Sequence, residues 1–244
     1  MILFTFLLTC GLIAVHILSK RLDFLRFSPR HVFLSFSSGV AVSYVFVHLL
    51  PELNEYQKEL EDTVQSNFWM VMEDHIYIVA MIGLAIFYGL EVMVRKKEEL
   101  DEKEGGDQES LQRFQIHMAS FFFYNAVIGY LMVRGEYEGV TGTLLFFVAM
   151  SVHFITNDWS LRESHKEEYD RFGRWLLAVA IFVGWSVGAF IEIKDVVVSL
   201  LTAFLAGGII LNVMKDELPE EQKSNLPAFL IGILSYTLLL VFLH

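Results

Sequence analysis

Long apolar segments constrain the fold of this chain more than any other feature of its sequence. Crossing about 30 Å of hydrocarbon takes roughly 20 residues of α-helix. Eight segments reach or approach that length, at about 1–19, 32–50, 74–94, 114–133, 139–161, 174–193, 195–214 and 227–244. A backbone in lipid must satisfy its own hydrogen bonds, as a helix does. The sequence therefore predicts an all-α integral membrane protein, with eight transmembrane helices in one domain embedded in the lipid bilayer.

The composition agrees with a membrane protein and excludes several functional classes. Of 244 residues, 55% are hydrophobic, which leaves too little polar surface for a soluble domain. A formal net charge of -11 argues against nucleic acid as a partner, because phosphate binding needs clustered Lys and Arg. Cys10 is the single cysteine, so an intrachain disulfide is impossible. Residues 1–18 lack the basic start of a signal peptide, so we expect a retained first helix.

The distribution of basic residues predicts the orientation of the helices. Of the 18 Lys and Arg residues, all but Lys58, Arg134 and Lys194 lie in or beside the loops after the first, third, fifth and seventh segments. Because basic residues accumulate in cytoplasmic loops, these four loops are predicted to be cytosolic and both termini non-cytosolic. We expect the plasma membrane as the location. The cytosolic loop 95–113 is predicted to be a solvated, flexible linker.

Two segments carry a similar pattern in opposite directions. The second contains SGVAVSYVFVHLLPE and the seventh contains AGGIILNVMKDELPE. The interval from Gly39 to Pro51 equals the interval from Gly207 to Pro219. The distribution of basic residues has the second segment leaving the cytosol and the seventh entering it. Similar segments of opposite direction indicate an inverted repeat, an architecture that secondary transporters use.

The fourth and fifth segments extend this pattern and hold the candidate functional site. Asn125 lies four residues after Phe121, and Asn157 lies four residues after His153. Since residues four apart share a helix face, each helix can present one ring and one amide inward. Asp158 follows directly, within the stretch SVHFITND. Polar groups in an apolar helix must find partners or perform a function, so we expect the functional centre here.

These features together resemble the ZIP family of divalent-metal transporters. The resemblance depends on eight segments with both ends outside, on the SGVAVSYVFVHLLPEL helix and on the AGGIILNVMKDELPEE helix. It covers nearly the whole chain by order of segments. It implies a ZIP-like bundle that transports zinc, iron or a related divalent cation as its substrate, with ligands from the fourth and fifth helices. A homodimer or a protein partner in the membrane is left open.

The resemblance, carried over position by position, assigns the metal ligands to four residues. They are His153, Asn157, Asp158 and Asn125. Phe121 stands where a fourth-helix histidine is expected, and Asn125 stands where an acid is expected. One imidazole, one carboxylate and two neutral amides make a weak donor set for zinc or ferrous iron. The same groups could instead bond across helices as polar contacts that hold the bundle together.

Two functional hypotheses follow from these residues. The first is divalent-cation transport by alternating access, through a site between the fourth and fifth helices. The second is a ZIP-fold protein without transport activity that acts as a structural, assembly or regulatory subunit. An enzyme is not expected, because no serine or cysteine nucleophile stands beside a histidine in a recognisable motif.

Other polar residues allow more than one interpretation. His117 either supplies an imidazole that is missing from the site or lies in water at the cytosolic end. His48 and Glu52 form either a cation-collecting site at the external end or a solvated helix end. Glu91 is expected to reach for the membrane surface or to pair with Arg95.

The remaining features of the apolar helices are expected to serve packing. His16 is predicted to be an isolated packing residue in the first helix. Gly184 and Gly188 form a face of small residues, which is typical of tight helix packing or of a dimer contact.

Overall fold

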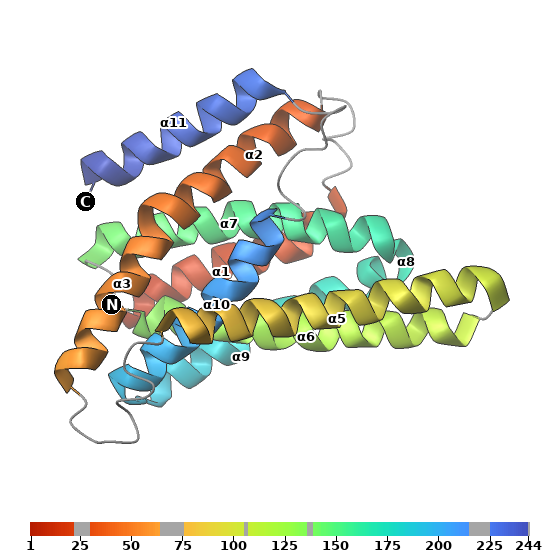
Figure 1. Cartoon of the computed structure of the whole chain (residues 1–244), viewed down its shortest axis with the longest axis horizontal. Coiled ribbons are helices and arrows are strands. Elements are labelled where there is room, and N and C mark those ends of the chain that lie inside the picture. Colours follow the sequence, from red (N-terminus) through yellow and green to blue (C-terminus); the bar gives the residue numbers. More distant parts are fainter. Residues whose placement is uncertain (22–29, 64–75, 105–106, 136–138, 215–224, 244) are drawn as a thin grey trace.

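The computed structural model describes residues 1–21, 30–63, 76–104, 107–135, 139–214 and 225–243 (Figure 1). The regular structure of these residues is helical throughout, so the all-α prediction is confirmed. The helices are α1 (Ile2–Leu18), α2 (Arg30–Tyr44), α3 (Leu50–Thr63), α5 (Ile76–Glu104), α6 (Asp107–Arg134), α7 (Gly139–Ser164), α8 (Lys166–Glu168), α9 (Arg174–Phe190), α10 (Asp195–Asn212) and α11 (Leu226–Leu243). Two short π-helical turns, η2 (Val45–Leu49) and η3 (Tyr169–Gly173), interrupt the α-helices.

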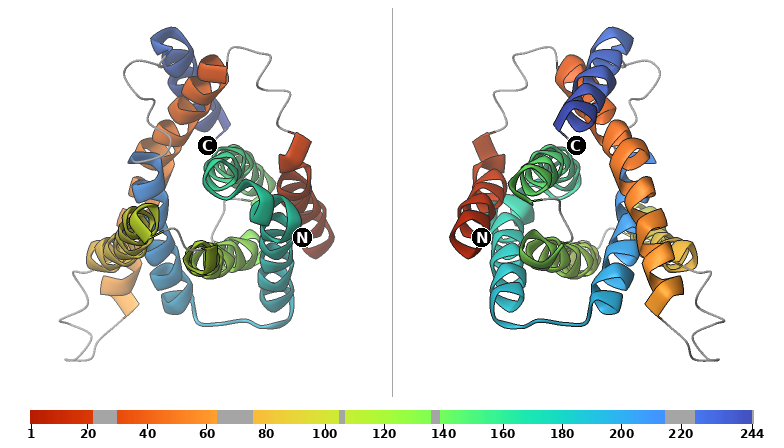
Figure 2. Two further views of the ribbon diagram at one scale, coloured as in Figure 1. Left: turned by 90° about the vertical axis from the view of Figure 1, so that its right-hand side faces the viewer. Right: turned by 90° about the vertical axis from the view of Figure 1, so that its left-hand side faces the viewer.

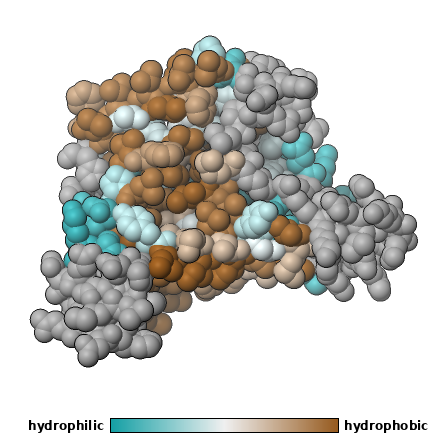
Figure 3. All heavy atoms as spheres, viewed as in Figure 1, coloured by the Kyte–Doolittle hydropathy of each residue, from teal (hydrophilic) through white to brown (hydrophobic). Residues whose placement is uncertain are grey.

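Seven helices among the described residues are long and apolar enough to cross a membrane. The eighth predicted segment corresponds to α11, which is apolar over the shorter stretch Leu226–Phe242. Hydrophobic side chains cover the middle of the face in Figure 3, and hydrophilic ones gather towards its two ends. An apolar band between polar ends is the surface expected in a bilayer. The chain is therefore a multi-pass membrane protein.

Helices extend beyond several of the predicted apolar segments. The segment 95–113, predicted as a linker, is helical at all of its described residues, because α5 continues to Glu104 and α6 begins at Asp107. Lys and Glu favour helix as strongly as most apolar residues do, so a charged segment can extend a helix into water. For the same reason, the polar helix α3 continues to Thr63, beyond the predicted apolar segment 32–50.

The N-terminus and the end of α11 lie at one end of the bundle, and the end of α5 and the start of α6 lie at the other (Figure 1). The helices form two groups, which Figure 2 shows on either side of the molecule. One group contains α1, α6, α7 and α9; the other contains α2, α5, α10 and α11. The first group holds the residues of the predicted site.

Glycines allow the backbones of several helix pairs to come into close contact. A Cβ atom on Gly39 of α2 would overlap the carbonyl oxygen of Phe229 on α11. A Cβ atom on Gly207 of α10 would likewise overlap the carbonyl oxygen of Ala80 on α5. Gly184 of α9 lies in the same way against the backbone of α6, which confirms that this face serves tight helix packing.

Candidate functional site

The predicted residues of α7 lie inside the bundle. His153, Asn157 and Asp158 are all buried, and Asp158 has no exposed surface. Residues at these positions face α1 and α6, because α7 packs between those helices and α2. Asn125 of α6 is also fully buried. These four polar residues therefore lie in the interior of the bundle.

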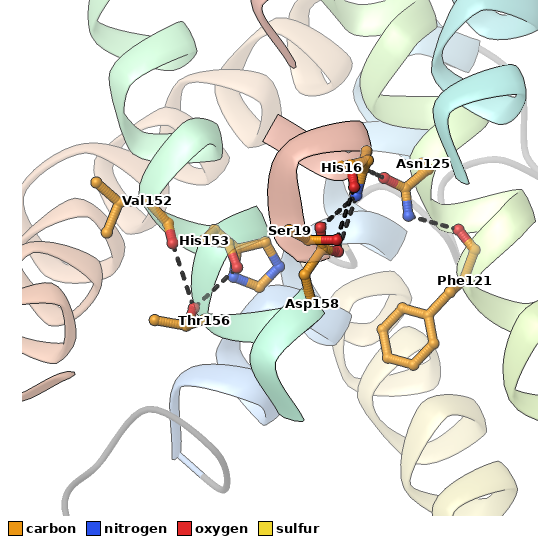
Figure 4. Close-up of polar contacts among 8 residues, drawn as sticks. All are labelled: His16, Ser19, Phe121, Asn125, Val152, His153, Thr156 and Asp158. Carbon is orange, nitrogen blue, oxygen red and sulfur yellow. Dashed lines mark hydrogen bonds and ion pairs between the residues drawn. The ribbon is translucent and has the colours of Figure 1, made fainter. Parts of the chain in front are cut away.

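Asp158 and Asn125 are joined by a third residue, His16 of α1. His16 Nδ1 lies 2.8 Å and 2.9 Å from the two carboxylate oxygens of Asp158. His16 Nε2 lies 3.0 Å from the Asn125 side-chain oxygen. Figure 4 shows the His16 ring between the two other side chains. The centre thus combines groups from three helices that are far apart in the sequence.

The hydrogen bonds of Asn125 fix the direction of this network. Its amide nitrogen donates to the carbonyl oxygen of Phe121 at 2.7 Å, so its side-chain oxygen must face His16. His16 Nε2 therefore donates to Asn125. The contact on the other side of the ring needs one proton between His16 Nδ1 and the Asp158 carboxylate, whichever of the two carries it. Every hydrogen-bonding atom of the His16 ring is satisfied.

His153 belongs to a second, separate pair. Its Nε2 lies 2.8 Å from the hydroxyl of Tyr124 on α6, and both residues are buried. Asn157 lies nearby on α7, and its amide nitrogen has no hydrogen-bond partner within the described part of the chain. Of the four predicted ligands, Asp158 and Asn125 thus belong to the His16 contacts and His153 belongs to the Tyr124 pair. The ring of Phe121, which holds the position of a predicted histidine, lies near Tyr124 and His117.

A set of polar contacts covers the centre on the side of η3. Arg162, one turn beyond Asp158 on α7, binds both carboxylate oxygens of Asp170, at 2.8 Å and 3.1 Å. Arg174 donates to the backbone oxygen of Ile17, at the end of α1. The buried ring of Tyr169 lies beside Asp158. These contacts tie the ends of α1, α7 and α9 together next to the His16–Asp158 pair.

His16 is the residue of this centre that the sequence analysis did not assign to it. It was predicted to be an isolated packing residue, and the structure corrects this, because both of its ring nitrogens bind polar partners of the site. A signal was present in the sequence. The buried positions of α1 are Thr5, Thr9, Leu12 and His16, so three polar residues share one stripe of an otherwise apolar helix. Only the tertiary contacts reveal what faces that stripe.

The charged residues near the helix ends are placed as follows. His48 Nε2 and Glu52 Oε2 lie 3.7 Å apart, so these two residues do meet. Glu91 lies 3.5 Å from His117 Nε2 of α6. The alternative partner predicted for Glu91, the Arg95 side chain, lies outside the described side chains. Within the described residues, no three His, Cys, Asp or Glu side chains together are placed to hold a metal ion.

Comparisons with known proteins found no match for this chain, either among protein-family models or among curated proteins.

Proposed function

We propose that this protein is a ZIP-like transporter that moves a divalent cation between α6 and α7 by alternating access. The observation that supports this most is the fully buried carboxylate of Asp158 beside an imidazole and an amide oxygen. Ionisable groups inside a membrane bundle are costly and commonly mark the path of an ion. Asp158, Asn125, His153 and Asn157 remain the proposed ligands.

An inverted repeat of eight spans is part of this proposal. A pseudo-two-fold axis that exchanges α1, α2, α5 and α6 with α9, α10, α11 and α7 would map the α2–α11 pair onto the α10–α5 pair. It would also map α6–α9 onto α7–α1, and all four pairs are in contact. Related transporters rock one repeat against the other around a central site, and α6 and α7 would meet at that axis.

Local backbone geometry supports the same repeat. Gly39 and Gly207 each pack against the backbone of another helix. A π-helical backbone begins six residues after each of them, at Val45 and at Val213. The matching Pro219 of the sequence pattern lies outside the described residues. Equivalent irregularities at equivalent positions are expected when two halves of a fold are related by symmetry.

The proposed topology places the basic loops in the cytosol. The α5–α6 connection would then be cytosolic, and both termini would be on the outside of the plasma membrane. In that orientation the contacts of Arg162 and Arg174 lie on the cytosolic side of the centre. They close that side, and alternating access would require them to open.

Binding of a cation at this centre requires a rearrangement. Asp158 and Asn125 both bind His16, so a cation can use their oxygens only after the imidazole has moved away. His153 must similarly leave Tyr124. The His16 ring would then act as an internal group that satisfies Asp158 when no cation is bound. A buried carboxylate left without any partner would be strongly unfavourable, which explains the need for such a group.

The second candidate is a ZIP-fold protein without transport activity, which acts as a structural, assembly or regulatory subunit. The closed hydrogen bonds of the centre favour it, because they hold α1, α6 and α7 together without any ion. Hydrogen bonds between membrane helices contribute about 0.6–2 kcal/mol each, enough for a purely structural role. This candidate predicts no cation flux and a stable partner on gentle purification.

Uptake of Zn²⁺ and Fe²⁺ into proteoliposomes distinguishes the two candidates. We expect the wild-type protein to give flux above that of empty liposomes, and Asp158→Asn to abolish it. Ser151→Ala is the matched control, because this serine lies on the same helix and its hydroxyl donates to the backbone oxygen of Phe147. Wild-type flux equal to that of empty liposomes, from protein shown to be folded, would leave the non-transporting candidate.

A further inference from the structure

A second group of potential metal ligands lies away from the His16–Asp158 centre, where α5, α6 and the start of α8 meet. It consists of Glu91, His117 and His165, which we call the peripheral cluster. His117 Nε2 lies 3.5 Å from Glu91 Oε2. The rings of His117 and His165 have their centroids 5.5 Å apart and cross at 75°. Two imidazoles and one carboxylate from three parts of the chain thus come together.

The distance between His117 and Glu91 does not fit a hydrogen bond. Such bonds between nitrogen and oxygen are about 2.7–3.2 Å long. Two ligands of one tetrahedral zinc ion, each at about 2.0–2.2 Å from the metal, are about 3.4 Å apart. The observed 3.5 Å therefore matches two atoms that share an ion better than two atoms that share a proton.

The separation of the two imidazoles fits the same arrangement. When two histidines bind one tetrahedral ion through their ring nitrogens, their ring centroids are about 5 Å apart. The centroids of His117 and His165 are 5.5 Å apart. The edge of the Phe114 ring and the ring of Phe121 lie next to these histidines and reduce the polarity of their surroundings.

The ring nitrogens of His117 make one long contact, with Glu91, and no hydrogen bond among the described residues. The His117 side chain is only 12% exposed. Leaving buried polar atoms unsatisfied costs about 1–3 kcal/mol per group. A ligand that coordinates one of these nitrogens would remove this cost.

We propose that the peripheral cluster binds a divalent transition-metal ion. The imidazoles favour zinc, cobalt, nickel or ferrous iron over calcium and magnesium, which prefer oxygen ligands. Glu91 and His117 are already spaced as a ligand pair. His165 does not yet complete a set of three, and it must turn towards them. Its backbone is non-helical and lies between the end of α7 and the start of α8.

The position of the cluster suits a second binding stage for the transported ion, an inference that rests on the proposed transport function. His117, Phe121 and Asn125 follow one another at intervals of four residues on one stripe of α6. The stripe leads from the centre towards the α5–α6 connection. An ion released from Asp158 towards that end would meet the peripheral cluster next, so the cluster serves as a second binding stage on the path.

Titration with Co²⁺ tests the site directly, because a tetrahedral Co²⁺ ion with nitrogen ligands has strong visible absorption bands. The experiment uses the purified full-length protein in detergent. We expect the wild-type protein to develop these bands, and His117→Ala and Glu91→Gln to lose them. His165→Ala is a second route to the same loss, in case His117→Ala does not fold. Glu192→Gln is the matched control for Glu91→Gln and keeps the bands, since Glu192 is an exposed carboxylate that pairs with Arg134 of α6.

Asp158→Asn separates this site from the transport centre. We expect this variant to keep the Co²⁺ bands while it loses cation flux. Bands that are lost in Asp158→Asn and kept in His117→Ala would place the metal in the centre and overturn the peripheral site. Absence of the bands from folded wild-type protein would overturn it as well. Cation flux tests the transport proposal, and the Co²⁺ bands test the peripheral cluster. The two proposals can therefore fail independently.

Discussion

The His16–Asp158–Asn125 centre and the peripheral cluster contain similar chemical groups but use them in opposite ways. In the centre, the imidazole is fully buried and both of its nitrogens bind oxygen atoms at 3.0 Å or less. In the cluster, neither ring nitrogen of His117 makes a hydrogen bond within the described residues, and Nε2 lies 3.5 Å from a carboxylate oxygen of Glu91. The comparison shows that a histidine beside a carboxylate can satisfy it with short hydrogen bonds, as His16 does, or lie at a longer distance that leaves its own ring nitrogens without one, as His117 does.

The largest expected effect comes from removing the imidazole of the centre. His16→Leu leaves the buried Asp158 carboxylate without its partner, which should lower the free energy of unfolding by about 3–5 kcal/mol. Thermal unfolding in detergent measures this as a large decrease in Tm. His117→Leu is the matched substitution in the peripheral cluster. Equal losses in the two variants would remove the distinction between the two regions.

Replacing both members of the buried pair should restore much of that loss. His16→Leu combined with Asp158→Leu removes the charge together with its partner, and buried ion pairs replaced by apolar residues are often neutral or even stabilising. We expect the double variant to be more stable than His16→Leu alone, and inactive in cation uptake. A double variant that is less stable than the single one would show that Asp158 has other essential partners.

Loss of the Arg162–Asp170 contact, which closes the centre on the side of η3, should have an intermediate effect on stability. Arg162→Gln removes a charged pair whose two hydrogen bonds join α7 to Asp170, so the loss should be about 1.5–3 kcal/mol. Arg171→Gln is the control, because Arg171 is exposed and only stacks on its neighbour Phe172. If both variants unfold at the wild-type temperature, this contact does not hold the helix ends together.

The Tyr124 hydroxyl, which forms a hydrogen bond with His153, should contribute less to the free energy of unfolding. Tyr124→Phe removes the 2.8 Å hydrogen bond and leaves the ring packing in place, so the loss should be about 1 kcal/mol. Tyr88→Phe on the exposed face of α5 provides the control. In the transport proposal, Tyr124→Phe also removes a group that competes with a cation for His153 Nε2 and should strengthen metal binding, which isothermal titration can measure.

The smallest effect on stability is expected in the peripheral cluster. His117→Leu exchanges unsatisfied ring nitrogens for apolar atoms, so the free energy of unfolding should stay within about 1 kcal/mol of the wild-type value or rise. The measurement is again thermal unfolding, without added metal. With excess Zn²⁺, the wild-type protein should gain stability and His117→Leu should not, because only the wild-type site binds the ion.

Local sequence patterns predicted the helices well, because the length of an apolar segment alone decides whether it can span lipid. They also located His153, Asn157, Asp158 and Asn125 in the interior. They could not reveal the bond between His16 and Asp158, which joins residues 142 positions apart. Its formation depends on how α1 packs against α7, and no local pattern encodes that contact. The extension of α5 and α6 past the membrane was missed for another reason, since charged residues suit both linkers and solvated helices.

The central claim is that Asp158 lies on the path of a divalent cation. Anomalous scattering from crystals of the protein grown with Co²⁺ or Zn²⁺ tests it most directly. We expect an anomalous peak within coordination distance of the Asp158 carboxylate, with the His16 ring moved away from it. Crystals that show His16 still bound to Asp158 and no peak beside the carboxylate, at a metal concentration that saturates uptake, would rule out Asp158 as a cation ligand.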